Sequence, residues 1–476
     1  MRDWIKGGAR HAFSWLFHLQ ARRILGTIYA LAVRERLADG SIRWPVRSTA
    51  SGRFTILVLT PSEFRGDPRA LASDYRTRVL ELPDHWLTRL MYQFYPADVP
   101  RKRQFQRYLA PPQGTPEETG KRQYRRFLER FLPCFYGWLD VDCVVGHHVL
   151  YSPDIDWGAV SDNLAVPYFV IHREGVSGGP ESFEFQTFLG ELMPIGEYTF
   201  EGSQMFVQND LVRELFIAGG LLTPDQITVL GTLRMDSFLN RIERVGDPTN
   251  CEDRRKRLVL FPFVVGGVTL EEPVLEVFSD VHETVAKVAL ENPEIDVLIK
   301  PKGPERWFRA WKAQADSAFS HCGIDPESIP NLEMRWDLDP HDVILTSDVI
   351  CGLNSTTLLE AGVAGKSVII PYFGALCDDT YDRRIYLKEE LDKFDVARSK
   401  DELEGLILAR LAEPSVPQDV LGPRRALFER YVSNLDGRVT ERCVDSMICH
   451  ANGMTGPRRK TAEILATSVG EEMRSF

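Results

Sequence analysis

A run of small and hydroxyl-bearing residues follows a short apolar stretch at 349–351. It consists of Gly352, Leu353, Asn354, Ser355, Thr356 and Thr357, and residues 358–361 after it are expected to open a helix. Backbone N–H groups and hydroxyls at the positive end of a helix dipole attract phosphate. Ser and Thr at the same place also serve as ordinary helix caps. The run therefore predicts a phosphate cradle, with a plain strand-to-helix connection as the alternative.

Two lysines flank a proline after another apolar stretch, 296–299. Lys300 and Lys302 would neutralise phosphate charge as point cations, although solvated surface lysines are the alternative. Glu360, one turn into the expected helix, would either meet a hydroxyl of the substrate or simply favour the helix start. Arg234 would hold either a phosphate or a hinge between domains.

Glu174 is the leading candidate for a general base, which a hydroxyl nucleophile needs in group transfer. It follows the apolar stretch 167–171 and precedes Gly175. A surface carboxylate paired with Arg173 is the alternative. His172 and His148 also stand at expected strand ends and are rival bases, although a strand-end histidine is more often structural. We expect no metal ion and no cofactor.

The composition sets the class of protein. With 476 residues, 43% of them hydrophobic, the chain can form two or three globular domains. Its net charge of −11 argues against a general nucleic-acid binder. The eight cysteines are scattered without Cys-x-x-Cys spacing, which favours reduced thiols in the cytoplasm.

The N-terminal 50 residues differ in charge from the rest of the chain. They carry nine basic and three acidic residues, a net charge of about +6. Residues 12–33 are too interrupted, by Arg22 and Arg23, to span a membrane. They look amphipathic, which predicts either attachment to the inner face of an anionic membrane or a helix packed on the protein body.

Apolar stretches and polar, helical segments alternate along the chain, which indicates parallel sheets with helices on both faces. Strands are expected at 54–60, 78–82, 141–146, 167–171, 205–208, 227–230, 258–262, 296–300, 332–334, 343–345, 349–351 and 366–371, and mostly helix after 373. The predicted division is a basic amphipathic helical segment at 1–50, a Rossmann-like acceptor domain at 51–240, a linker at 241–257, a Rossmann-like donor domain with closing helices at 258–451, and a weakly ordered tail at 452–476.

This order resembles the GT-B glycosyltransferases, which have two facing Rossmann-like domains, over about residues 54–440. Three places carry the resemblance: Gly231-x-x-Arg234-x-Asp236, Ile299 to Gly303, and the run from Asn354 to Lys366. Within the fold they look like the bacterial surface-polysaccharide branch, which includes CMP-sugar-dependent sialyl and Kdo transferases and CDP-glycerol transferases. Glu174-Gly175 stands at that branch's acidic-Gly motif and Ser355-Thr356 at its Ser-Ser motif. Lys300-Pro301 stands where His-Pro is expected, so a fixed positive charge replaces an imidazole.

The resemblance implies a metal-independent, inverting glycosyltransferase. It would move a sugar, such as a CMP-activated acidic sugar, to a surface-polysaccharide or lipid-linked glycan acceptor. Glu174, His172 and His148 are the candidate catalytic residues, and the donor would be held by Lys300, Lys302, Asn354, Ser355, Thr356, Thr357, Glu360 and Arg234. Transfer of polyol phosphate from a CDP-alditol, 2-epimerisation of a nucleotide-sugar, and non-catalytic binding of polysaccharide are the alternatives.

Overall fold

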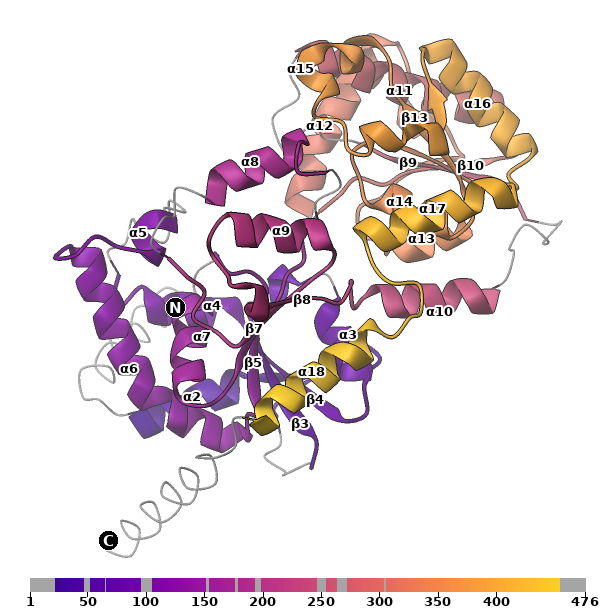
Figure 1. Ribbon diagram of the computed structural model, residues 1–476. Coiled ribbons are helices and arrows are strands. Elements are labelled where there is room, and N and C mark those ends of the chain that lie inside the picture. Colours follow the sequence, from indigo (N-terminus) through magenta and orange to yellow (C-terminus); the bar gives the residue numbers. More distant parts are fainter. Residues whose placement is uncertain are drawn as a thin grey trace, which may run out of the picture. The chain divides into compact units, whose positions relative to one another are not determined.

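The computed structural model describes residues 22–46, 52–64, 66–95, 105–150, 154–175, 179–192, 198–245, 254–262, 272–303 and 305–453. They form two compact units. The first comprises the chain up to Glu174, Leu189–Asp236 and the chain from Gly437, and the second comprises Gly175–Phe188 and Ser237–Asp436. Each unit holds one sheet with helices on both faces (Figure 1). The predicted class, α/β with two Rossmann-like domains, is therefore confirmed.

The sheet of the first unit has the strand order β2-β1-β4-β3-β5-β6-β7-β8. Strands from β3 onward run parallel, whereas β1 pairs antiparallel with both β2 and β4. The strands are β1 (Arg34–Arg36), β2 (Ile42–Arg43), β3 (Phe54–Leu59), β4 (Thr77–Leu82), β5 (Cys143–Gly146), β6 (Tyr168–Ile171), β7 (Gln204–Val207) and β8 (Ile227–Val229).

Both faces of this sheet are buried, which explains its nearly continuous apolar strands. On one face, strand residues such as Ile56 and Val145 pack with Leu71 of α3 (Asp67–Ser73) and Met447 of α18 (Val439–Gly453). On the other face, α2 (Arg22–Ala32), α6 (Pro116–Leu139) and α7 (Asp154–Asn163) join through aromatic rings. Tyr29, Phe131, Phe135 and Trp157 form that aromatic cluster.

The sheet of the second unit is entirely parallel, in the order β11-β10-β9-β12-β13-β14. Its strands are β9 (Arg257–Phe261), β10 (Asp296–Ile299), β11 (Leu332–Met334), β12 (Val349–Gly352), β13 (Ser367–Pro371) and β14 (Asp395–Ala397). Helices α11 (Glu272–Glu291), α12 (Glu305–His321) and α16 (Lys400–Ala412) lie on one face, and α13 (Pro340–Thr346), α14 (Thr357–Val363) and α17 (Gln418–Tyr431) on the other (Figure 1).

Each sheet has a point where the direction of winding reverses. In the second unit the chain proceeds from β9 to β10 and β11, then returns to β12 on the other side of β9. In the first unit the corresponding reversal separates β3 and β5. Ligands of open parallel sheets bind outside the carboxyl ends of the strands at such a point.

Three local expectations were wrong. Residues 343–345 belong to α13 because Pro340 occupies its first turn and Asp339 caps it, accepting from the N–H groups of His341 and Asp342 at 2.9 and 3.2 Å. Within the expected helical segment 1–50, residues 34–43 form the β1–β2 hairpin, and residues 1–21 lie outside the described ranges. Beyond residue 373 the chain also contains a strand, β14.

The ends of the units differ from the predicted domain ranges. Helix α10 (Met235–Val245) extends into the expected linker, and α18 joins the first unit. Asp236 fixes this return, because its carboxylate accepts from the N–H groups of Val439 and Thr440 at 3.0 and 2.6 Å. None of the helices among the described residues is long and apolar enough to cross a membrane.

Candidate functional site

The loop after β12 lies at the reversal point of the second sheet. Asn354 adopts a left-handed conformation, with φ of 51°, which asparagine tolerates better than most residues. Its side-chain amide donates to the Arg384 carbonyl at 2.9 Å, and its oxygen accepts from the Tyr386 N–H at 2.8 Å. Asn354 therefore anchors this loop to residues 384–386.

The three hydroxyl residues that follow are partly buried. The Ser355 hydroxyl donates to Thr357 Oγ1 at 2.9 Å and accepts from the Thr357 N–H at 3.3 Å. Thr356 stands at the cap position of α14 without a side-chain capping bond. The local bonds of Ser355 match the capping alternative. They leave room for a second partner on each hydroxyl, since a hydroxyl has one donor and two acceptor positions.

Lys300 comes directly after β10, on the other side of β9 from this loop. The residue is 8% exposed, and no hydrogen bond joins its ammonium group to a residue within the described ranges. Burial lowers the pKa of Lys300, while the charges of Asp339 and Asp337 counteract this effect. Lys302, two residues later, is exposed.

A second buried lysine of the same unit has a different environment. Lys366, 5% exposed, donates from Nζ to the carbonyls of Leu345 and Ser347 at 3.1 and 2.8 Å. These bonds give Lys366 a structural role, since they satisfy carbonyls near the end of α13. Lys300 is thus the buried lysine of the two that retains hydrogen-bonding capacity for a ligand.

Glu360 is buried and faces a neighbouring helix. Its Oε2 lies 3.4 Å from Nε2 of His341 in α13, and the His341 ring stacks on Phe238 with centroids 4.3 Å apart. Glu360 therefore joins α13 to α14 in this structure. Its predicted contact with a substrate hydroxyl stays a prediction.

In the first unit, Glu174 lies two residues beyond the end of β6. Its side chain is 30% exposed and lies 3.5 Å from the guanidinium of Arg173, as in the surface-pair alternative. His172 is buried, with Nδ1 2.9 Å from the backbone oxygen of Glu174 and 3.3 Å from its N–H. His172 therefore holds the backbone from which the Glu174 side chain projects.

His148 lies beside His172, with ring centroids 4.7 Å apart. Its Nδ1 accepts from the Leu150 N–H at 3.0 Å, and Phe216 of α9 (Asp210–Ala218) packs against both rings. Burial holds the pKa of both histidines well below its usual value. The two imidazoles are consequently neutral at pH 7, and Glu174 is the most exposed of the three candidate bases.

The structure also joins three residues that the sequence did not group. His147 Nδ1 lies 2.9 Å from Thr60 Oγ1, and Thr60 donates to Asp154 at 3.3 Å. Thr60 follows β3 and His147 follows β5, so the group lies at the reversal point of the first sheet. Thr60 has φ of 47°, which is strained for a β-branched residue and frequent at functional sites.

The predicted residues divide between the two units. His148, His172 and Glu174 come together in the first unit, and Lys300, Lys302 and residues 354–357 share the carboxyl edge of the second sheet. Arg234 belongs to the first unit, where its Cβ would contact a side chain placed on Gly66. In the described part of the chain, no group of three or more His, Cys, Asp or Glu side chains could hold a metal ion.

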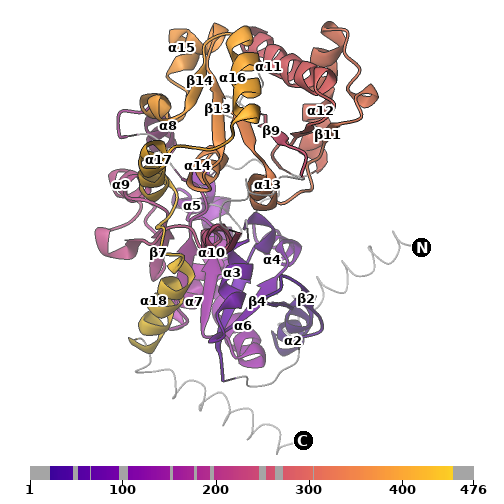
Figure 2. The ribbon, with the colours of Figure 1, turned by 90° about the vertical axis from the view of Figure 1, so that its right-hand side faces the viewer.

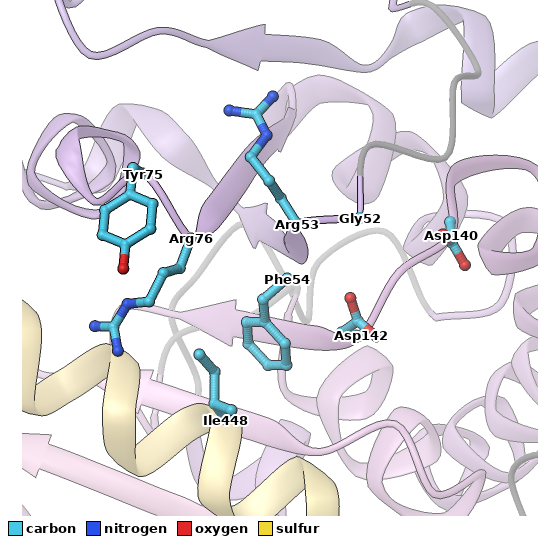
Figure 3. A pocket seen from close by; sticks show the side chains of 8 residues that line it. All are labelled: Gly52, Arg53, Phe54, Tyr75, Arg76, Asp140, Asp142 and Ile448. Carbon is cyan, nitrogen blue, oxygen red and sulfur yellow. The ribbon is translucent and has the colours of Figure 1, made fainter.

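A shallow hollow of about 620 Å³ lies at the opposite, amino edge of the first sheet (Figure 3). Phe54 at the start of β3, Asp142 before β5, and Tyr75 and Arg76 before β4 line it. Asp142 accepts from the Thr55 N–H at 2.7 Å, and Arg76 pairs with Asp74 and Asp445. Its charged groups thus already support the fold, and it is separate from the residues described above.

The chain thus has two Rossmann-like units, and each carries polar side chains at the reversal point of its sheet. No family model and no curated protein matches the chain. Among solved structures, the chain is similar to a putative UDP-N-acetylglucosamine 2-epimerase from Listeria monocytogenes, with a TM-score of 0.47 and 13% identity over 84% of this chain and 97% of the other. It is also similar to the UDP-GlcNAc 2-epimerase from Methanocaldococcus jannaschii, with a TM-score of 0.46 and 12% identity over 83% and 99%.

A third similar structure is a UDP-forming trehalose-phosphate synthase from Burkholderia xenovorans, with a TM-score of 0.45 and 10% identity over 84% of this chain and 100% of the other. These scores and identities are too low to carry an inference about the activity of this chain. All three proteins are named for UDP or a UDP-sugar, and the predicted resemblance to CMP-sugar transferases stays a prediction.

Proposed function

We propose that this chain is a nucleotide-sugar-dependent glycosyltransferase that needs no metal ion. The second unit binds the phosphate of the donor, and the first unit activates a hydroxyl of a glycan or lipid-linked acceptor. A CMP-activated acidic sugar is the donor class that the motifs favour. The proposal assigns donor binding to Lys300, Lys302 and Ser355 to Thr357, and acceptor activation to Glu174.

Lys300 is the observation that carries the proposal. Burying an ammonium group costs free energy unless a partner compensates it. Lys300 is 8% exposed, and Asp339 and Asp337 offset this cost through their charges without a hydrogen bond to its ammonium group. It follows β10 at the sheet edge where open parallel sheets bind ligands. A phosphate there would supply the missing acceptor oxygens, and the hydroxyls after β12 would supply further donors.

Glu174 is the base that the proposal favours over the histidines. A carboxylate takes the proton of the attacking hydroxyl while the hydroxyl oxygen bonds to the anomeric carbon of the sugar. The bond from that carbon to the nucleotide breaks, and the nucleotide leaves with the bonding electron pair. His148 and His172 are neutral, as a base must be, but both are buried. They are therefore better placed to position neighbouring residues than to contact an acceptor. His172 serves this purpose by fixing the Glu174 backbone.

The first test is a thermal-shift screen of the full chain with CMP, CDP, UDP and GDP. A ligand at a hundred times its Kd stabilises the folded state by about 2.7 kcal/mol, which the screen detects easily. We expect Lys300→Met to reduce this stabilisation and Lys366→Met to leave it unchanged. No stabilisation by any nucleotide at millimolar concentration would exclude the proposed donor class.

Product analysis then separates the reactions. The nucleotide-sugar selected by the screen is incubated with and without a membrane-derived glycolipid fraction. A glycosyltransferase releases nucleotide only when the acceptor is present, whereas a 2-epimerase converts the nucleotide-sugar without one. Phosphorus labelling identifies polyol-phosphate transfer, because the phosphate then travels to the acceptor.

A further inference from the structure

Helix α2 and strand β2 expose a group of large apolar side chains on the first unit. We call Ile24, Leu31, Ile42 and Trp44 the α2–β2 patch. Ile24 and Leu31 are two turns apart on one face of α2, while Leu25 and Tyr29 of the same helix are fully buried. The Trp44 indole donates to the Leu31 carbonyl at 2.7 Å, so the two elements lie side by side (Figure 2).

The side chains of the patch are largely exposed to solvent. Trp44 is 63% exposed, Leu31 58%, Ile24 53% and Ile42 40%. Ile42 lies in β2, and Trp44 follows that strand directly. Exposed apolar side chains that gather in this way mark an interaction surface more often than scattered ones do.

The sequence that carries the patch has more arginines than carboxylates. Residues 22–53 contain seven basic and two acidic residues, although the whole chain has a net charge of −11. Glu35 alone faces three guanidinium groups, those of Arg43, Arg53 and Arg78, at 3.4–3.9 Å. Arg43 and Arg53 remain about half exposed, so positive charge reaches the solvent beside Trp44.

We infer that the α2–β2 patch docks on the surface of an anionic lipid bilayer. Tryptophan and aliphatic side chains enter the interfacial region, and arginines beside them bind lipid phosphates. A second copy of the chain would bring the same arginines against each other, so charge disfavours self-association. The segment 1–21, with three basic residues and one acidic residue, would meet the same repulsion if it covered the patch.

This inference does not depend on the proposed activity. It also differs from the sequence-based expectation, which placed membrane affinity in residues 12–33. In the structure, the apolar side chains that would enter the membrane are those of the α2–β2 patch. The acidic remainder of the chain would be repelled by the same lipids, which restricts the protein to one docking face.

The test is co-sedimentation of the full chain with vesicles of phosphatidylcholine containing about one-third phosphatidylglycerol. Leu31→Ser/Ile42→Ser should weaken binding about tenfold or more, because two apolar anchors are lost. Leu290→Ser/Leu408→Ser is the matched control, since these side chains of the second unit are 60% and 39% exposed. The control should bind as the wild type does, and both variants should keep the wild-type melting temperature.

Further measurements distinguish binding of a membrane from binding of a second copy of the chain or of residues 1–21. Binding should fall in high salt and on vesicles of phosphatidylcholine alone. Equal binding by the two double variants would overturn the inference. So would a dimer in sedimentation velocity that Leu31→Ser/Ile42→Ser dissociates, because the patch would then join two copies. Loss of all binding on deleting residues 1–21, with Leu31→Ser/Ile42→Ser unchanged, would overturn it as well.

Discussion

The Nδ1 atom of His172 lies 2.9 Å from the backbone oxygen of Glu174, two residues further along the chain. Because burial keeps His172 neutral, one of its two nitrogens carries a proton and the other accepts. A proton on Nδ1 gives a bond to the Glu174 carbonyl and leaves Nε2 as an acceptor. The imidazole thus fixes the start of the loop whose side chain we propose as the base.

Glu174→Gln should lower turnover by roughly 10²–10⁴, the usual contribution of a positioned base. The substitution keeps the size of the side chain and removes its ability to accept a proton. Affinity for the donor nucleotide, measured by titration calorimetry, should change little. Glu214→Gln on the exposed side of α9 is the control and should retain activity. If Glu174→Gln keeps more than about a tenth of the wild-type turnover, a different group is the base.

Lys300→Met should weaken nucleotide binding by about 10- to 100-fold, the usual worth of a charge-assisted hydrogen bond. The unliganded protein should keep its melting temperature, because no hydrogen bond to a described residue is lost. Ser355→Ala should weaken binding in the same direction. Calorimetric titration with the nucleotide selected by thermal shift measures both effects.

Lys366→Met supplies the contrast for this prediction. It leaves the carbonyls of Leu345 and Ser347 without their donor, which should cost about 1–3 kcal/mol of unfolding free energy. Nucleotide affinity of the folded protein should remain at the wild-type value. The opposite pattern, with Lys300→Met destabilising and Lys366→Met impairing binding, would remove Lys300 from the proposed site.

The sequence was most informative where apolar runs are long. Strands β3 and β10 were predicted within one or two residues, because buried parallel strands are nearly continuous in apolar residues. The run Val343-Ile344-Leu345 is too short for its periodicity to distinguish strand from helix. Asp339-Pro340 before it was the signal that favours a helix.

The candidate site could be predicted only in part. Side chains after parallel strands must share a sheet edge, so Lys300 and Ser355 could be grouped from the sequence. The group of Thr60, His147 and Asp154 could not, because it requires β3 to lie beside β5 and Thr60 to adopt a positive φ. The hydrogen bond from α18 to Asp236 joins residues about 200 positions apart, and no local sequence pattern predicts it.

The second unit should lose stability in acid because of His282. It is fully buried in α11 between Phe278 and Phe319, and burial lowers its pKa to about 4. In the unfolded chain the imidazole of His282 binds a proton near pH 6.5. Between pH 4 and 6.5 the unfolded state therefore holds more protons than the folded state. Stability is therefore complete above pH 6.5 and falls as the pH drops towards 4, by up to about 1.4 kcal/mol per pH unit.

His282→Leu should reduce this acid dependence by the same amount while the fold is kept. Urea unfolding at several pH values, followed by Trp fluorescence, measures the slope. His321, at the end of α12, is the control position, and His321→Leu should leave the slope unchanged. Equal slopes for the wild type and His282→Leu would show that other groups cause the acid sensitivity.

Asp236 should stabilise the return of the chain to the first unit. Its carboxylate accepts from two N–H groups at the start of α18, where a helix leaves four donors without helical partners. Burial nevertheless raises the pKa of Asp236, so the charge itself is costly and the acceptor oxygens are what the helix requires. Asp236→Ala should therefore cost about 0.5–2 kcal/mol of unfolding free energy, the range measured for lost helix caps.

Asp236→Asn retains one acceptor oxygen and should recover most of this stability. Limited proteolysis checks the location of the effect, because Asp236→Ala should expose α18 to cleavage and Asp236→Asn should not. Asp225→Ala in the turn before β8 is a control acidic substitution in the same unit. If Asp236→Asn destabilises the protein as much as Asp236→Ala does, the charge of Asp236 rather than its hydrogen bonds holds α18 in place.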